Sequence, residues 1–159
     1  MSYTAVNTLI DAAFPPGALY YWKSTFLTDL SDDVIDVMVE RFAVCPSPMT
    51  ALVCEHFHGA VTRIPADAMA VPHREPGYNL IIASGWLGAA TTDANVTWTR
   101  ETFAAIEPYR FDRRYVNYMT EDDQGAVREA FGANYDRLVE LKRVWDPDNL
   151  FRQNQNIAP

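Results

Sequence analysis

The run of greatest chemical interest in the sequence is residues 115–118, Tyr-Val-Asn-Tyr. We expect a short strand from Arg114 to Met119, because aromatic and β-branched residues favour a pleated surface. Alternate side chains of a strand share a face, so Tyr115 and Asn117 would point to the same side. A phenol and an amide on one wall of a cleft can accept a proton and anchor a ligand. Free tyrosine has a pKa near ~10, so this role needs a perturbed environment, and simple aromatic packing is the alternative.

The other side-chain types that could bind metal or react are sparse. His56 and His58 lie two residues apart and could share one face of a strand, but no third metal ligand follows them at a suitable spacing. We therefore expect structural hydrogen bonding and no metal site. Cys45 and Cys54 are the two cysteines, and we expect reduced thiols there in preference to a disulfide. Arg63 could bind an acidic group or form an ordinary ion pair.

Composition excludes several classes of function. The chain has 159 residues, with 13 Lys and Arg against 21 Asp and Glu, so its net charge is -8. An acidic chain is a poor candidate for binding a phosphate backbone, so we expect no nucleic-acid partner. No stretch approaches the ~20 apolar residues of a membrane span, and the first residues do not resemble a secretory signal, which predicts a cytoplasmic protein. The seven glycines form neither G-x-G-x-x-G nor a Walker loop, and G-x-S-x-G and H-E-x-x-H are also absent.

Hydrophobic patterning indicates the elements that must position residues 115–118. Strands and helices are interspersed, which favours an α+β fold, with a largely antiparallel sheet and helices packed on one of its faces. Pro and Gly are spread along the whole chain, which suits one domain covering residues 1–159. Strands are expected at 19–27, 50–57, 60–64, 70–74, 78–86 and 114–119, and helices within 31–45, 93–107 and 121–144.

Ordered sequence blocks also carry a resemblance to a known family. The main ones are residues 115–118 (YVNY), 131–135 (FGANY), 142–151 (KRVWDPDNLF) and 155–157. They resemble the C-terminal signature of the berberine bridge enzyme-like FAD-linked oxidases, with the signature region at 113–159. Weaker upstream blocks in the same order are 21–24 (YWKS), 59–63 (GAVTR) and 72–74 (PHR).

The resemblance implies a substrate domain, an antiparallel sheet backed by helices that covers the reactive face of a flavin. The FAD-binding domain of that family has no counterpart in residues 1–159, so FAD is expected only in a complex with such a domain. A partner chain or a missing N-terminal half would supply it, and this chain alone is expected to be inactive. In the assembled enzyme, an alcohol or another C–H donor would lose a hydride to flavin N5.

The resemblance also implies roles for individual residues. Tyr115 opens the family's Y-x-N motif and is expected to act as catalytic base, while Asn117 lies near the flavin or substrate. Many plant members carry a catalytic Glu or Gln on the strand before a Trp. The corresponding stretch here, residues 78–82, has no acid, and Tyr78 and Asn79 are expected to bind substrate.

Two alternatives remain open at this stage. One is a non-enzymatic module derived from the same domain, which binds a small molecule or forms a homodimer through the surface that would otherwise meet the FAD domain. The other is a cofactor-free enzyme that uses the same cleft. The sequence does not identify a substrate.

Overall fold

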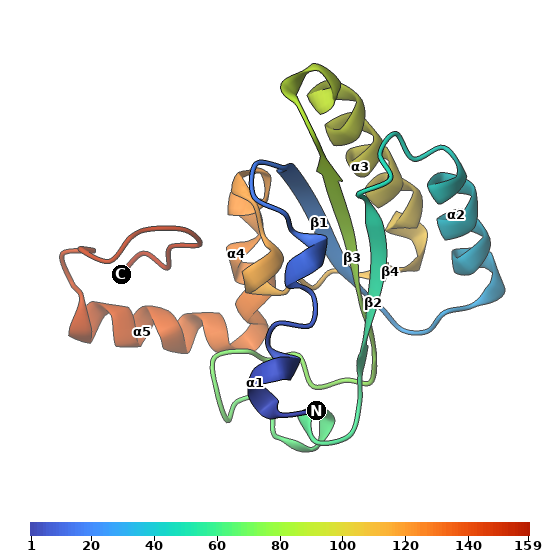
Figure 1. The fold of residues 1–159 in the computed structure, drawn as a ribbon. Helices are drawn as coiled ribbons and strands as arrows, with labels where there is room; N and C mark the ends of the chain where they lie inside the picture. The colour runs from blue at the N-terminus through green and yellow to red at the C-terminus, as the bar shows by residue number, and fades with distance from the viewer.

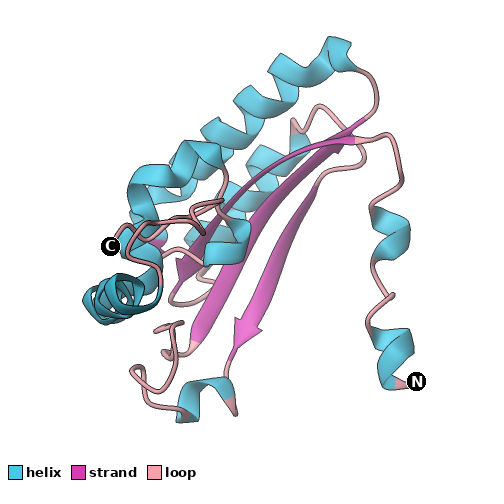
Figure 2. Ribbon diagram, turned by 90° about the vertical axis from the view of Figure 1, so that its left-hand side faces the viewer, coloured by secondary structure: helices cyan, strands magenta, loops and turns pink.

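A computed structural model describes residues 1–159, except for the side chain of Gln124. In the described chain, an antiparallel sheet with strand order β2-β3-β1-β4 carries helices on one face (Figures 1 and 2). This confirms the α+β fold expected from the sequence. The strands are β1 (Leu19–Leu27), β2 (Ala51–Phe57), β3 (Gly77–Trp86) and β4 (Arg110–Phe111). The α-helices are α1 (Tyr3–Val6), α2 (Asp32–Ala43), α3 (Thr92–Ile106), α4 (Val127–Phe131) and α5 (Tyr135–Trp145).

The pairing of β1 with β3 divides the side chains between the two faces of the sheet. The register runs from Leu19 opposite Trp86 to Leu27 opposite Tyr78. Because side chains alternate along a strand, Leu27 and Thr25 face the helices while Trp22 and Phe26 face the other side. We call this second side the open face. β2 continues both faces, since it pairs with β3 over its full length.

The core lies between the sheet and helices α2 and α3. Val34 of α2 and Trp98 and Ile106 of α3 pack there against Leu80 and Ile82 of the central strand. The Trp98 indole N–H donates to the Arg41 carbonyl oxygen at 2.9 Å, which ties α3 to the end of α2. Burying these apolar side chains is the main contribution that holds the helices on this face.

Two expected edge strands do not form. Residues 61–63 adopt a 3-10 helix, and residues 70–74 belong to an irregular segment. Pro65 and Pro72 lack the N–H that a sheet ladder requires, which limits pairing on either side of them. A long connection therefore joins β2 to β3 where the sequence predicted two further strands.

The helix expected over residues 121–144 is also interrupted. A 3-10 helix covers Glu121–Ala126, and α4 and α5 follow with a second 3-10 turn between them. Gly132 has φ +48°, a conformation that ends α4 and that a residue with a Cβ rarely adopts. Beyond this break, α5 extends away from the body of the molecule (Figure 1).

The tight packing of the central strand gives a stability prediction. Ile82 is fully buried, and removing three carbons from it should lower the free energy of unfolding by roughly 2–5 kcal/mol through lost contacts and a residual cavity. Urea denaturation of Ile82→Ala measures this loss. Ile64→Ala is the matched control, because Ile64 lies in a loop and is 36% exposed. Equal losses in the two variants would contradict the position of the core.

Candidate functional site

The open face presents a row of aromatic and apolar side chains. Trp22 lies opposite Ala83, which in turn lies opposite Ala51 of β2. Small residues in this row leave room beside the indole. One row further, Tyr20 lies opposite Gly85, where an added Cβ would come within 3.0 Å of the Tyr20 ring. Glycine at this position therefore lets a large aromatic ring lie flat across the sheet.

The segment expected to be a strand at residues 114–119 contains a 3-10 turn, Val116–Tyr118. This corrects the predicted pattern of alternating faces. A 3-10 helix has three residues per turn, so side chains three apart lie above one another. Tyr115 and Tyr118 accordingly meet edge to face, with ring centroids 5.2 Å apart. Asn117 still approaches Tyr115, because its amide N–H donates to the phenol oxygen at 3.1 Å.

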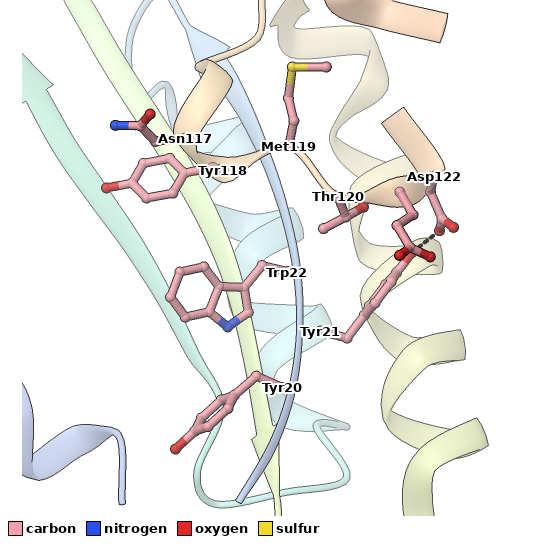
Figure 3. A pocket seen from close by; sticks show the side chains of 9 residues that line it. Tyr20, Tyr21, Trp22, Asn117, Tyr118, Met119, Thr120 and Asp122 are labelled. Atoms are coloured by element: carbon pink, nitrogen blue, oxygen red, sulfur yellow. Dashed lines mark hydrogen bonds between the residues drawn. The ribbon is translucent and has the colours of Figure 1, made fainter. Parts of the chain in front are cut away.

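Tyr118 reaches across the open face to β2. Its hydroxyl donates to Glu55 Oε1 at 2.8 Å, and the Asn79 amide donates to Glu55 Oε2 at 2.8 Å. Glu55 and Asn79 are direct cross-strand partners on β2 and β3, so the sheet register places the carboxylate and the amide side by side. Figure 3 shows Tyr118 on the same side of β1 as Trp22.

The environment keeps Tyr118 protonated. Burial raises the pKa of its phenol, and the hydrogen bond to Glu55 together with the charge of that carboxylate raises it further. A phenolate beside a carboxylate is strongly disfavoured, so Tyr118 is a hydrogen-bond donor at neutral pH. Among the described contacts, Tyr115 has none with a carboxylate, and its oxygen accepts a hydrogen bond from Asn117 instead. The two tyrosines of the motif can therefore take different chemical roles.

Two cavities lie next to Tyr118. The first has a volume of about 410 Å³ and lies along β1 beside residues 117–122. The second has a volume of about 280 Å³, lies over the open face, and is closed in part by the N-terminal segment around Phe14. Tyr20, Trp22 and Tyr118 line both cavities. We call the second one the open-face cavity.

Ion pairs hold the segment around residues 114–123 against β1. Lys23 and Asp123 are both 7% exposed, and the ammonium lies 2.9 Å from the carboxylate. Arg114 reaches the same carboxylate at 3.3 Å. Next to this pair, Asp122 accepts a hydrogen bond from the Tyr21 hydroxyl (Figure 3) and another from the Arg100 guanidinium. A buried pair of this kind fixes the path of the chain, because removing one partner would leave a buried charge.

The residues predicted from sequence are distributed unevenly over the site. Asn117 lines the larger cavity, while Tyr115 lies next to Tyr118 and lines neither. Asn79 is buried on the open face and bound to Glu55. Tyr78 faces the helices, where its ring stacks on His56 with centroids 4.7 Å apart. The two residues expected to bind substrate therefore lie on opposite faces of β3.

Sequence reasoning missed Glu55, and it did not place Trp22 among the candidate site residues. The signal for Glu55 was present in the sequence. Residues 51–57 are apolar except for Glu55 and His56, and Glu55 is the one acid among them. An acid inside a strand invites a search for a partner on the next strand. That partner, Asn79, becomes visible only once the register of β2 and β3 is known.

The remaining candidates show no sign of a metal centre. His56 and His58 lie beside each other with ring centroids 4.2 Å apart. In the part of the chain that the structure describes, no group of three or more His, Cys, Asp or Glu side chains is arranged to hold a metal ion. Both cysteines are free thiols. No described helix combines the length and the apolar character needed to cross a membrane.

Comparison with known proteins finds relatives of this chain by sequence. Residues 114–158 match the family model described as "Berberine and berberine like". The chain is 28% identical to an FAD-linked oxidoreductase of Dictyostelium discoideum over 159 residues, which cover 99% of this chain and 34% of that protein. It is also 28% identical to YvdP of Bacillus subtilis, an FAD-linked oxidoreductase, over 81% of this chain and 29% of that protein.

Solved structures have the same fold. Berberine bridge enzyme from Eschscholzia californica superposes with a TM-score of 0.80 at 20% identity, over 89% of this chain and 33% of that one. The chain thus spans about a third of the length of the relatives that it matches. These findings confirm the resemblance to the berberine bridge enzyme-like FAD-linked oxidoreductases.

The buried ion pair predicts how stability depends on pH. Burial raises the pKa of Asp123, but hydrogen bonds from Thr120 and Lys23 outweigh burial and hold it below its usual value. A depressed folded-state pKa stabilises the fold above the unfolded pKa, near ~3.9, and this contribution is lost as pH falls through the folded value. We expect unfolding free energy to fall as the pH is lowered from about 5 through the folded-state pKa of Asp123, and to fall less in Asp123→Asn.

Chemical denaturation at several pH values measures this slope. Asp67→Asn is the control, because Asp67 is exposed in a loop and forms none of the described salt bridges. An Asp123→Asn slope equal to that of the unsubstituted chain would contradict the assignment.

Proposed function

We propose that this chain is the substrate-binding part of an FAD-linked oxidoreductase, which removes a hydride from an alcohol or another C–H donor. The family relationship supports the reaction class. The observation that carries the proposal within the structure is the contact of Tyr115 with Asn117 and Tyr118, because Asn117 and Tyr118 line the cavity along β1. An aromatic face with few and well-placed polar groups is typical of a ligand site.

The residues that line the cavity of about 410 Å³ along β1 fit a flavin. The Trp22 indole N–H is buried and, among the described residues, has no hydrogen-bond acceptor. An unpartnered donor beside aromatic rings suits a planar heteroaromatic group that carries acceptor atoms. Trp22 and Asn117 would contact the FAD. FAD, when bound, supplies the acceptor for the hydride.

Tyr115 is proposed as the catalytic base. Its phenol oxygen accepts the O–H proton of an alcohol while the C–H hydrogen leaves as hydride, so the donor loses two electrons and two hydrogens. The Asn117 amide donates to the Tyr115 oxygen and stabilises negative charge there. Tyr118 stays protonated and orients the site, because its hydroxyl is held by Glu55. Asn79 acts on the substrate side by fixing that carboxylate.

An FAD-binding domain is the proposed partner, supplied by a second chain or by the rest of a longer protein. The relatives are about three times as long as this chain. The end of α5 and the following turn also expose large apolar side chains, with Trp145 81% and Phe151 78% exposed. Asp146 holds this turn in shape by accepting the backbone N–H groups of Leu150 and Phe151. An ordered apolar tip of this kind suits a protein–protein contact.

A binding or dimerisation module without flavin chemistry is the second candidate. The observation in its favour is a groove of about 550 Å³ between α2 and the outer edge of β2, lined by exposed Ile35, Val39 and Phe42. Apolar surface next to a strand edge favours association. Light scattering measures the oligomeric state of the purified chain. A stable homodimer would favour this second candidate, and a monomer would favour a part of a larger enzyme.

The partner proposal gives the first functional prediction. The chain purified alone should be colourless, and co-expression with the FAD-binding polypeptide encoded beside it or joined to it should give a yellow complex. The absorbance of that complex should be bleached by a substrate under anaerobic conditions. A colourless mixture with no complex on size-exclusion chromatography would contradict the proposal.

The base assignment gives the second functional prediction. Tyr115→Phe removes the hydroxyl and keeps the ring, so kcat of the reconstituted enzyme should fall roughly 10²–10⁴-fold, with little change in substrate affinity. Single-turnover flavin reduction measures the step directly. Tyr3→Phe is the matched control, because Tyr3 is 81% exposed and should leave the rate unchanged. Retention of full activity in Tyr115→Phe would exclude this tyrosine as base.

A further inference from the structure

The open-face cavity has a small and mainly apolar interior. Its volume is about 280 Å³, and its walls include Phe14, Val53, Ile81 and Ala83. An engineered apolar cavity of ~150 Å³ binds benzene, so a space of this size suits a bicyclic aromatic ring system. A sugar of that size would bring many hydroxyl groups into a wall that offers few hydrogen-bond partners, and burying them unpaired is costly.

Aromatic rings surround one end of this cavity. The Phe14 ring lies 5.5 Å from Trp22 and 5.6 Å from Tyr20 between centroids, and the Trp22 ring lies 6.3 Å from that of Tyr118. All four rings line the same space. Rings grouped in this way attract a cation through their negative faces, in addition to packing against an apolar ligand.

Glu55 supplies the only formal charge in the described lining of the cavity. Each of its oxygens accepts one hydrogen bond, from Tyr118 and from Asn79, which is the pattern of a carboxylate. Both donors are neutral groups. Among the described residues, no Lys, Arg or His side chain forms a salt bridge with Glu55. A carboxylate in apolar surroundings without a cation favours a positively charged ligand.

We infer that the open-face cavity binds a small bicyclic aromatic compound that carries a protonated amine, with the ammonium group at Glu55 and the ring system among Phe14, Trp22 and Tyr20. This ligand is a substrate class for the proposed oxidoreductase. The inference rests on the proposed function only in one respect, which is that the open-face cavity is taken as the substrate-binding site. Each carboxylate oxygen retains a lone pair, so an ammonium can be added to the two existing hydrogen bonds.

Three indole derivatives and one sugar test the inference on the chain itself, without flavin. Tryptamine carries an ammonium, tryptophol is its neutral alcohol counterpart, indole-3-propionate is an anion, and glucose is a polyol. Calorimetry gives each affinity, and the NMR signal of the Trp22 indole N–H reports whether binding occurs at this cavity. We expect tryptamine to bind roughly tenfold to a hundredfold more tightly than tryptophol, with indole-3-propionate and glucose weaker still.

Glu55→Gln tests the origin of that preference. The amide keeps the size of the side chain and removes its charge, so tryptamine and tryptophol should bind with nearly equal affinity. Unchanged binding of tryptophol would show that the variant remains folded. Glu40→Gln makes the same chemical change on the exposed surface of α2, and it should leave the preference for tryptamine intact.

Several outcomes would overturn the inference. The first is equal binding of tryptamine and tryptophol to the unsubstituted chain, and the second is a preference for tryptamine that survives Glu55→Gln. The other two concern the Trp22 indole N–H signal: a response to glucose, or no response to tryptamine and tryptophol. Because no flavin is involved, these results are independent of whether an FAD-binding partner exists. Failure to form a flavin complex would in turn leave the amine preference in place.

Discussion

The register between β1 and β3 is the constraint on which the rest of the molecule depends. Every residue of β1 has a partner on β3, and this pairing decides which side chains meet the helices and which reach the open face. A shift by one residue would turn Trp22 toward α3 and bring Lys23 onto the open face. The buried helix-facing residues of both strands, such as Leu27 and Ile82, make that shift costly. The apolar core therefore fixes the geometry of a site that lies on the other side of the sheet.

The site also depends on a segment far along the chain. β4 pairs with β1 only at Phe26 and Leu27, so the chain leaves the sheet edge early and is free to turn over it. The contact of Lys23 with Asp123 then fixes where the segment crosses, and the 3-10 turn before it sets Tyr118 above the sheet. One buried charge on β1 thus places a tyrosine from the C-terminal third of the chain. Hydrophobic burial fixes the sheet on one face, and the ion pairs around Asp123 fix the position of this segment at the sheet edge.

Sequence patterns were sufficient where burial alone determines structure. The limits of β1 were predicted to the residue, and the strand expected at 78–86 forms as β3 with one additional residue. Patterns failed where local geometry competes with them. Residues 114–119 have the composition of a strand, yet they form no ladder with any strand of the described chain, and a 3-10 turn forms instead. The partnership of Glu55 with Tyr118 was out of reach for a similar reason, because it joins residues that only the folded sheet brings together.

The difference between the two tyrosines of the motif follows from these constraints. They are three residues apart on one turn and have the same chemistry in isolation, but only Tyr118 reaches the carboxylate on β2. That contact commits its proton to Glu55, and the same turn leaves the Tyr115 oxygen with an amide donor. Fixing the proton of one of two like groups is a common basis for separating their roles in a site. Here the separation originates in the sheet register, since Glu55 has its place only because β2 and β3 align it with Asn79.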